Sequence, residues 1–391
     1  MKPRPEPQFS FRFSRREFLK WCGWSGLSLF LAGCIPSRTL TATATAVSKA
    51  TITPFRSLTP VPTSTTTPAY RSMAAIGRAG AYDLTLLRAE LERMLDGIGG
   101  LKDVVRPGAH VGIKPNLTGE TWWDSSLPSP ATELFAVHPV LVQALAELLL
   151  DAGAGKVTIL EGLGDSLIFP HWGYTAMAEA LGAGLVDLCG QAPFSSWKIF
   201  PVGPGYSVYE YFYLNPILAD LDVFVSVGKM KCHATTGVTL ALKNLFGIAP
   251  ISLYRRHPED NNRSAFHGSA AYDARVPRVI LDLNLACPVQ LAVIDGVMTA
   301  EGGAGPWSKG LSQVKPGVLV ASTDPVAADA VATAIMGFDP AAAAGIEPFV
   351  GGDNHLALAA EVGLGTNRLD EIGIVGHPIQ DVRFPFKLAT V

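Results

Sequence analysis

The chain has 391 residues, of which 48% are hydrophobic and 17% are charged, and its formal net charge is −3. Residues 1–33 hold six Lys or Arg and two Glu, so the rest of the chain carries about −7. This acidic balance argues against nucleic acid, and against an anionic membrane surface, as a binding partner.

The N-terminus has the features of an exported lipoprotein. Residues 14–20 (SRREFLK) look like a twin-arginine export signal. The apolar stretch 21–32 is shorter than the ~20 residues of a spanning helix, and LAGC at 31–34 resembles a bacterial lipobox. We therefore expect a signal peptide at 1–33 and a lipid anchor on Cys34, which places the protein in the cell envelope, at the outer face of the cytoplasmic membrane. The alternative is an uncleaved anchor or a chance cysteine.

The segment that follows predicts a tether. Residues 34–72 are dominated by Thr, Ser, Ala and Pro, and such a composition cannot bury enough apolar surface to offset the entropy of ordering. Residues 73–391 are then the folded part, long enough for one large α/β domain.

Helical and extended patterns alternate along the folded part. Helices are expected at 84–97, 138–152, 172–182, 238–247, 276–286, 325–336 and 353–362. Strands are expected at 109–114, 156–161, 184–188, 221–228, 289–295, 317–322 and 371–375. This alternation predicts an α/β fold, with a largely parallel or mixed sheet and helices on both faces.

Polar residues follow five of the expected strands. In open α/β sheets, ligands bind just outside the carboxyl ends of parallel strands, so these residues are candidates for one shared crevice. Asp324 precedes a proline, which favours a helix cap over a chemical role for this residue. The strand-end residues are Lys114, Asn116, Glu161, Lys229, Asp295 and Asp324.

The stretch 221–250 concentrates the most unusual charges. If the chain stays extended after its strand, Lys229, Lys231 and His233 share one face. Lys243 is the only formally charged residue between His233 and Arg255. A lysine in apolar surroundings requires a counter-charge, a ligand or a lowered pKa, so this stretch predicts a site for an anion.

Several of these motifs together resemble the family called domain of unknown function 362. The resemblance rests on KPNL at 114–117, KMKCH at 229–233, the run from Thr239 to Gly247, DG at 295–296 followed by EGGAGP at 301–306, and ASTDP at 321–325. It covers roughly residues 102–340. Many members carry paired ferredoxin-type cysteine clusters. This chain has five cysteines and no CxxC spacing, so we expect no iron–sulfur cluster.

The function that we expect is an enzyme acting on a phosphate- or carboxylate-bearing substrate, either a small molecule or a polymer. His233 would be the general acid or base, and Glu161 and Asp295 would orient it or bind a divalent metal. The expected substrate-binding residues are Lys114, Asn116, Lys229, Lys231, Lys243 and Asn244.

Two alternatives remain open. One is a metal-dependent hydrolase or transferase whose metal is held by His233, Asp295 and His267, with Glu161 or Asp324 completing the set of ligands. The other is a non-catalytic solute-binding lipoprotein. Residues 251–275 are polar and too long for an ordinary connection, which favours either a lid over the site or a solvated loop.

Overall fold

The computed structural model describes residues 70–269 and 272–389. The predicted signal sequence, Cys34 and nearly all of the tether lie outside the described residues. None of the helices in the described part is long and apolar enough to cross a membrane.

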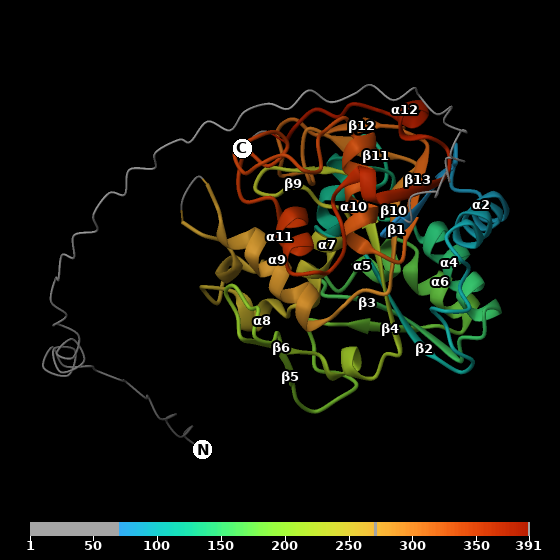
Figure 1. The fold of residues 1–391 in the computed structure, drawn as a ribbon. Helices are drawn as coiled ribbons and strands as arrows, with labels where there is room; N and C mark the ends of the chain where they lie inside the picture. Colours follow the sequence, from blue (N-terminus) through green and yellow to red (C-terminus); the bar gives the residue numbers. More distant parts are fainter. Residues whose placement is uncertain (1–69, 270–271, 390–391) are drawn as a thin grey trace, which may run out of the picture. The chain divides into compact units, whose positions relative to one another are not determined.

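A mixed sheet of eight strands organises the described residues (Figure 1). Across the sheet the order is β14 (Ile372–Gly376), β1 (Ser72–Arg78), β13 (Val318–Ser322), β10 (Leu291–Gly296), β7 (Val223–Lys229), β2 (His110–Pro115), β3 (Lys156–Glu161) and β4 (Gly184–Asp187). Within the run from β10 to β4, adjacent strands are parallel to one another, whereas β13 is antiparallel to both β10 and β1. The predicted α/β fold class is therefore confirmed.

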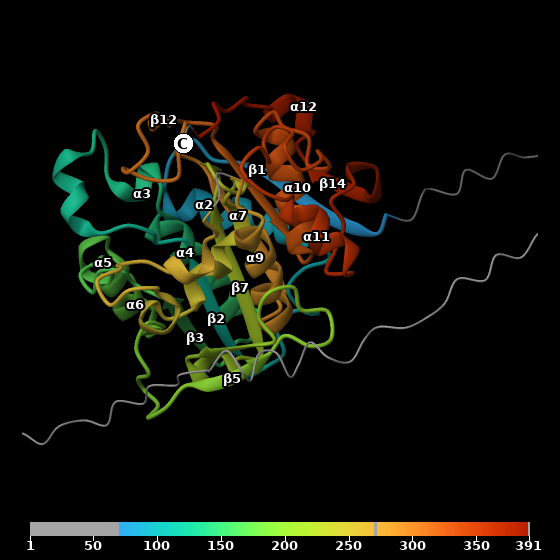
Figure 2. The ribbon, with the colours of Figure 1, turned by 90° about the vertical axis from the view of Figure 1, so that its left-hand side faces the viewer.

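Helices cover both faces of the sheet. Figure 2 shows β7, β2 and β3 in the centre, with α6 on one side and α10 and α11 on the other. One apolar core lies beneath α2 (Leu84–Gly97), α4 (Pro139–Asp151) and α6 (Tyr174–Leu181). A second lies beneath α7 (Leu240–Asn244), α9 (Arg275–Ala286), α10 (Pro325–Ile335) and α11 (His355–Glu361).

Local sequence explains where several helices begin. Asp83 accepts a hydrogen bond from the amide of Leu86 and starts α2, and Asp324 accepts from the amides of Val326 and Ala327 and starts α10. Pro139 occupies the first turn of α4, where a missing N–H costs nothing.

The predicted helix at 238–247 is wrong at its start. Gly237 and Val238 form β9, which pairs with β8 (Cys232–His233) in a small hairpin. Leu240 then has a φ of +50°, and α7 contains only five residues before a 3₁₀ turn, Leu245–Ile248. The strand pairing holds Gly237 and Val238 extended, so the helix cannot begin there.

The sequence patterns did not predict strand β1 or two further hairpins. β1 begins at residue 72, the position expected to end the tether, and its sequence SMAAIGR has a single β-branched residue. The other missed strands are β5 (Lys198–Pro201), β6 (Tyr211–Leu214), β11 (Thr299–Glu301) and β12 (Ser312–Val314). Short helices also occur at α3 (Ala131–Leu134), α5 (Ile168–His171), α8 (Ile251–Tyr254) and α12 (Ile379–Val382).

Candidate functional site

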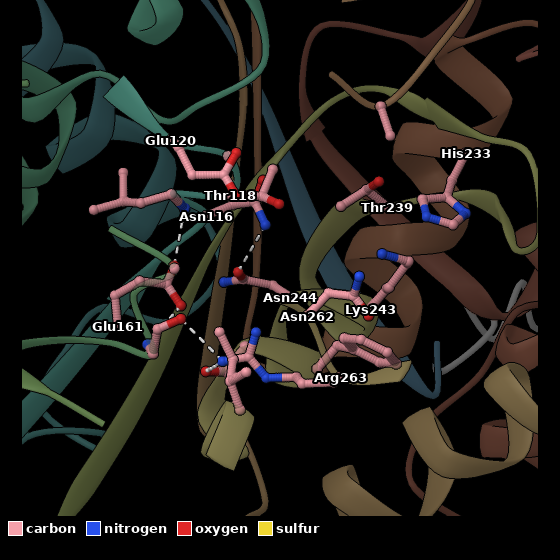
Figure 3. A pocket seen from close by; sticks show the side chains of 18 of the residues that line it. Asn116, Thr118, Glu120, Glu161, His233, Thr239, Lys243, Asn244, Asn262 and Arg263 are labelled. Atoms are coloured by element: carbon pink, nitrogen blue, oxygen red, sulfur yellow. Dashed lines mark hydrogen bonds between the residues drawn. The ribbon is translucent and has the colours of Figure 1, made fainter. Parts of the chain in front are cut away.

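A cavity of about 400 Å³ opens where β2, β3 and β7 end, and we call it the Lys243 cavity (Figure 3). Its volume is typical of sites for small molecules. Side chains from the strand ends, from α7 and from the segment after α8 line it. The ionisable or polar side chains that line it include Lys114, Asn116, Glu161, Lys231, His233, Thr239, Lys243, Asn244, Arg263 and His267.

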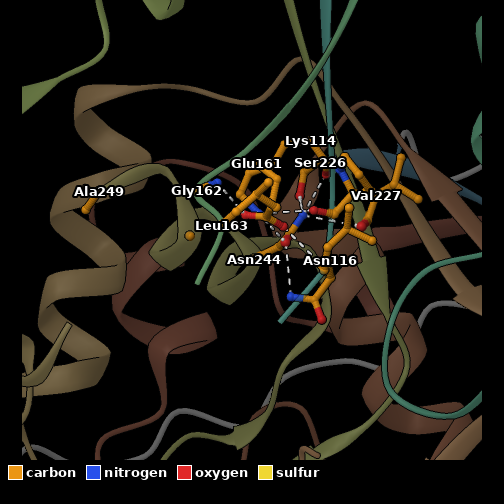
Figure 4. A network of polar contacts seen from close by, with 12 residues as sticks. Lys114, Asn116, Glu161, Gly162, Leu163, Ser226, Val227, Asn244 and Ala249 are labelled. Carbon is orange, nitrogen blue, oxygen red and sulfur yellow. Dashed lines mark hydrogen bonds and ion pairs between the residues drawn. The ribbon is translucent and has the colours of Figure 1, made fainter. Parts of the chain in front are cut away.

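Lys114 and Glu161 form a buried ion pair at one side of the cavity (Figure 4). Lys114 Nζ lies 2.7 Å from Glu161 Oε1 and donates to Asn244 Oδ1 at 2.9 Å. Glu161 also accepts from the backbone amides of Leu117 and Gly162. Burial lowers the pKa of Lys114, and the Glu161 carboxylate partly offsets that effect. Glu161 is thus committed to Lys114 and to backbone amides, and none of its hydrogen bonds in the described residues goes to His233.

Asn244 fixes the orientation of Asn116. The amide nitrogen of Asn244 donates to the carbonyl of Lys114 and to Ser226 Oγ, so Asn244 Oδ1 is the acceptor, and Asn116 Nδ2 donates to it at 3.2 Å. Asn116 Oδ1 is then left buried without a hydrogen-bond partner in the described residues. Such an acceptor calls for a donor from water or a ligand.

Two glycines allow this network to pack closely. A Cβ on Gly247 would lie 2.5 Å from Glu161 Oε1 and 2.8 Å from Lys114 Nζ, and one on Gly162 would lie 2.2 Å from the carbonyl oxygen of Gly247. Arg263 joins the same backbone, because its Nη2 donates to the carbonyls of Gly162 and Gly247. The close approach of these segments explains why side chains are absent there.

Lys231 has no carboxylate partner among the described residues. Its Nζ donates to the carbonyl of Phe135 at 2.6 Å, and the side chain is 1% exposed. Burial lowers the pKa of Lys231 well below its usual value, and the nearby charges of Lys243 and Lys229 lower it further. A protonated Lys231 would therefore be stabilised by any anion that enters the cavity.

Lys243 is less constrained still. Its side chain is partly buried, and its Nζ makes neither an ion pair nor a hydrogen bond within residues 70–269 and 272–389. The amine lies 5.3 Å from the centroid of the Phe246 ring. Burial lowers the pKa of Lys243 to about 7, with Lys114 and Arg263 adding to the effect. Near neutral pH this amine exists in both protonation states.

His233 presents one nitrogen to its own loop. Its Nδ1 lies 3.2 Å from the amide of Thr235 and 3.4 Å from the amide of Thr236, and it accepts from both. Burial lowers the pKa of His233 well below 6.5, as do Lys243 and Lys231. The neutral ring therefore carries its proton on Nε2, which makes it a hydrogen-bond donor. This tautomer suits an orienting or acidic role better than that of a general base.

Thr239 supplies a second unsatisfied polar atom. Its side chain is 2% exposed and lines the cavity, and its Oγ1 has no hydrogen-bond partner in the described part of the chain. Figure 3 shows Thr239 and His233 on the same side of the cavity as Lys243. A hydroxyl, an N–H and an amine thus surround one region of the cavity.

Lys229 and Asp295 lie apart from this group. Lys229 Nζ is 2.9 Å from Asp295 Oδ2, and neither side chain is exposed or lines the cavity. Lys229 also donates to Tyr82 Oη and to the carbonyl of Thr132, while Asp295 accepts from Tyr82 Oη. The expectation that both residues contribute to the crevice is wrong, because each satisfies the other inside the protein.

Asp324 lies at the opposite edge of the sheet. Because β13 is antiparallel to β10, its last residue, Ser322, pairs with Ala292 at the beginning of β10. The expectation that Asp324 lies in the crevice is therefore wrong, and its carboxylate caps α10. Of the five candidate metal ligands, His233, His267 and Glu161 line the cavity, and Glu161 is already paired with Lys114. The described residues contain no group of three or more His, Cys, Asp or Glu suited to a metal ion.

The segment 251–275 reaches the cavity through residues that the sequence analysis did not single out. Arg263, Asn261 and Asn262 line it together with His267, whereas Arg255, Arg256 and His257 do not. Trp307 lines it too, from the glycine-rich run after Asp295. The polar composition of the segment indicated that it could reach the site, but composition alone cannot show which of its arginines lines the cavity.

Comparisons with known proteins place the chain in a family. The family model described as "Domain of unknown function (DUF362)" matches residues 111–334. The chain is 30% identical over 273 residues to the thylakoid-associated protein sll1697 of Synechocystis, and the aligned region covers 68% of this chain and 74% of that protein. A crystal structure of a Thermotoga maritima protein aligns with a TM-score of 0.33 and 10% identity, over 63% of this chain and 57% of that one. The chain spans less than two thirds of the length of that Thermotoga protein. On the family match and the Synechocystis relative, the chain belongs to the family of domain of unknown function 362.

Proposed function

We propose that the Lys243 cavity binds a small phosphate- or carboxylate-bearing molecule and that the protein is an enzyme acting on it. The observation that carries this proposal is the position of Lys243, whose amine faces the cavity and whose protonated form has no carboxylate to balance it in the described residues. An anion would supply the missing charge.

The balance of charge around the cavity supports an anionic ligand. Its formal positive charges are Lys114, Lys231, Lys243 and Arg263, against Glu120 and Glu161. The chain as a whole is acidic, so this excess is local. A focused positive potential in a partly enclosed cavity attracts small anions.

The other lining residues have roles that follow from their contacts. Lys243, Arg263 and Lys231 would hold the anion, and the Nε2–H of His233 would donate to it or to the reacting group. Lys114, Glu161 and Asn244 bind one another and would shape the wall. Perturbed amines in a cavity are also typical of catalytic sites, which favours an enzyme over a passive receptor.

Thermal unfolding in the presence of simple anions tests the binding step. Phosphate and malonate, compared with chloride at equal ionic strength, should raise the melting temperature by roughly 5 °C at concentrations far above Kd. Lys243→Met should keep the starting melting temperature and lose most of this increase. Lys102→Met is the matched control, because Lys102 is exposed and outside the cavity.

The outcome separates binding from structure. If Lys243→Met unfolds the domain without added anion, the lysine has a structural role and the proposal loses its main support. If phosphate and malonate stabilise the Lys243→Met variant as much as the unmodified protein, the anions bind elsewhere. Anion binding without turnover of any phosphate ester or carboxylic acid would favour a solute-binding protein.

We also propose that the protein is a lipoprotein anchored through Cys34 at the outer face of the cytoplasmic membrane. The twin-arginine motif and LAGC at 31–34 support this, and the Synechocystis relative is named a thylakoid-associated protein. Mass spectrometry of the mature N-terminus should find an acylated Cys34. A Cys34→Ala protein that stays entirely in the membrane fraction would contradict the lipid anchor.

A further inference from the structure

We infer that Lys243 is a nucleophile that forms an imine with a carbonyl group of an anionic ligand, such as a 2-oxo acid or a phosphorylated aldehyde or ketone. This inference rests on the proposed function, because the anionic part brings the ligand into the cavity. It narrows the ligand to one that carries a carbonyl carbon next to the anionic group.

The contacts of the four nearby lysines distinguish Lys243 from the others. Lys114 and Lys229 are each paired with a carboxylate, and the Nζ of Lys231 donates to the carbonyl of Phe135. These three amines are held in fixed positions inside the protein. Lys243 Nζ has none of these restraints and lines the cavity, so its nitrogen lone pair is available once the proton is lost.

The charge environment supplies the neutral amine. A lysine needs its lone pair to attack a carbonyl, and nearby cations together with poor solvation are the means by which proteins provide it. Lys114 and Arg263 disfavour the ammonium form of Lys243, and burial does so most strongly. The Nζ of Lys243 faces the cavity without an ion pair or a hydrogen bond in the described residues, so the neutral amine is free to reach the carbonyl of a bound ligand.

The remaining polar groups fit the carbonyl oxygen. The Nε2–H of His233 and the unpaired hydroxyl of Thr239 lie in the same region of the cavity. Hydrogen bonds from such donors stabilise the oxygen as negative charge develops on it. Arg263 and Lys231 are then left for the carboxylate or phosphate of the same ligand.

The reaction is balanced without a further reagent. The neutral amine of Lys243 bonds to the carbonyl carbon, and a proton moves from nitrogen to oxygen to give a carbinolamine. Loss of the hydroxyl as water leaves a carbon–nitrogen double bond, so one amine and one carbonyl yield one imine and one water. Nothing is oxidised or reduced, and the step is reversible until the imine reacts further.

Reductive trapping tests the inference with the full chain. Glyoxylate is the probe, since it is the smallest anionic aldehyde, and cyanoborohydride reduces its imine to a stable carboxymethyl-lysine that peptide mapping can locate. At pH 7 an amine with a pKa near 7 is about half neutral, whereas an ordinary lysine is neutral about a thousand times less often. Even with its weaker intrinsic nucleophilicity, Lys243 should be modified at least about tenfold faster than the exposed Lys102 and Lys198.

Two controls make the result specific. Acetaldehyde lacks the anionic group, so its preference for Lys243 over Lys102 should be smaller than that of glyoxylate, and phosphate should slow the modification by glyoxylate alone. Lys243→Arg keeps a positive charge but cannot form an imine, so it should bind phosphate and show no adduct in its α7 peptide.

The possible outcomes separate this inference from the proposed function. Stabilisation by phosphate without preferential modification of Lys243 would overturn the nucleophile and leave the anion site standing. Preferential modification by acetaldehyde as well as glyoxylate, unaffected by phosphate, would show a reactive lysine without an anion site. Equal modification of Lys243, Lys102 and Lys198, with no stabilisation by phosphate, would overturn both.

Discussion

Two pairs of lysines near the same edge of the sheet have different environments. Lys114 and Lys229 each contact a carboxylate, whereas Lys231 and Lys243 contact none in the described residues. The register of the sheet explains the ion pair of Lys229, since this residue lies directly beside Asp295 on the neighbouring parallel strand. Lys231 and Lys243 lie beyond the end of β7 and have no such neighbour. A paired lysine at this edge is committed to its carboxylate, and an unpaired one is available to a ligand.

Removing one member of the deepest pair should have the largest effect. Lys229→Met leaves the Asp295 carboxylate fully buried with only neutral donors around it, including Tyr82 Oη. An uncompensated buried charge of this kind costs about 3–5 kcal/mol. Urea unfolding of Lys229→Met and of the unmodified protein at pH 7 measures the difference.

A second substitution checks the cause of that loss. Lys229→Met combined with Asp295→Asn removes the unpaired charge while keeping an acceptor for Tyr82, so it should recover part of the lost stability. If the double variant is less stable than Lys229→Met alone, burial of an unpaired carboxylate is not the reason. Lys102→Met should remain within about 0.5 kcal/mol of the unmodified protein.

Asp324 and Asp295 show how far the sequence could predict the site. Both follow an apolar strand and precede a small turn or helix, so the sequence alone assigned both to one crevice. The two strands are antiparallel, and their ends lie at opposite edges. Strand direction depends on long-range pairing with β1 and β10, which no local pattern encodes.

The parallel part of the sheet was more predictable. Each of β2, β3 and β7 is a short apolar run with a Lys or Glu at or near its end, and the intervening helices α4 and α6 bury apolar residues. Parallel neighbours bring their ends together, so Lys114, Glu161 and Lys231 are close in space as expected. Arg263 was missed because its place depends on how backbone carbonyls of Gly162 and Gly247 meet across the fold.

Replacing Asp324 should have an intermediate effect on the free energy of unfolding. Asp324→Ala removes the acceptor for two amides in the first turn of α10 and for the amide of Thr366. Loss of a helix cap costs about 0.5–2 kcal/mol. Urea unfolding at pH 7 should show a loss in this range, and stabilisation by phosphate should be unchanged because Asp324 is at the far edge. A reduced response to phosphate would mean that the two edges are coupled.

Lys243→Met should have the smallest effect on stability at neutral pH, and it should alter how stability depends on pH. The pKa of Lys243 is about 7 in the folded protein, below the ordinary value of about 10.4 that it regains on unfolding. Between those values the unfolded chain holds more protons, so the free energy of unfolding of the unmodified protein rises with pH. Lys243→Met lacks this titration and should gain less stability when urea unfolding is compared between pH 7 and pH 9. Lys114, Lys229 and Lys231 remain in both proteins, but the charge of Lys243 also lowers the pKa of Lys231. The difference between the two slopes therefore reports on Lys243 together with its effect on Lys231. If both proteins gain equally, Lys243 keeps an ordinary pKa in the folded state, and the contrast between paired and unpaired lysines does not extend to their protonation.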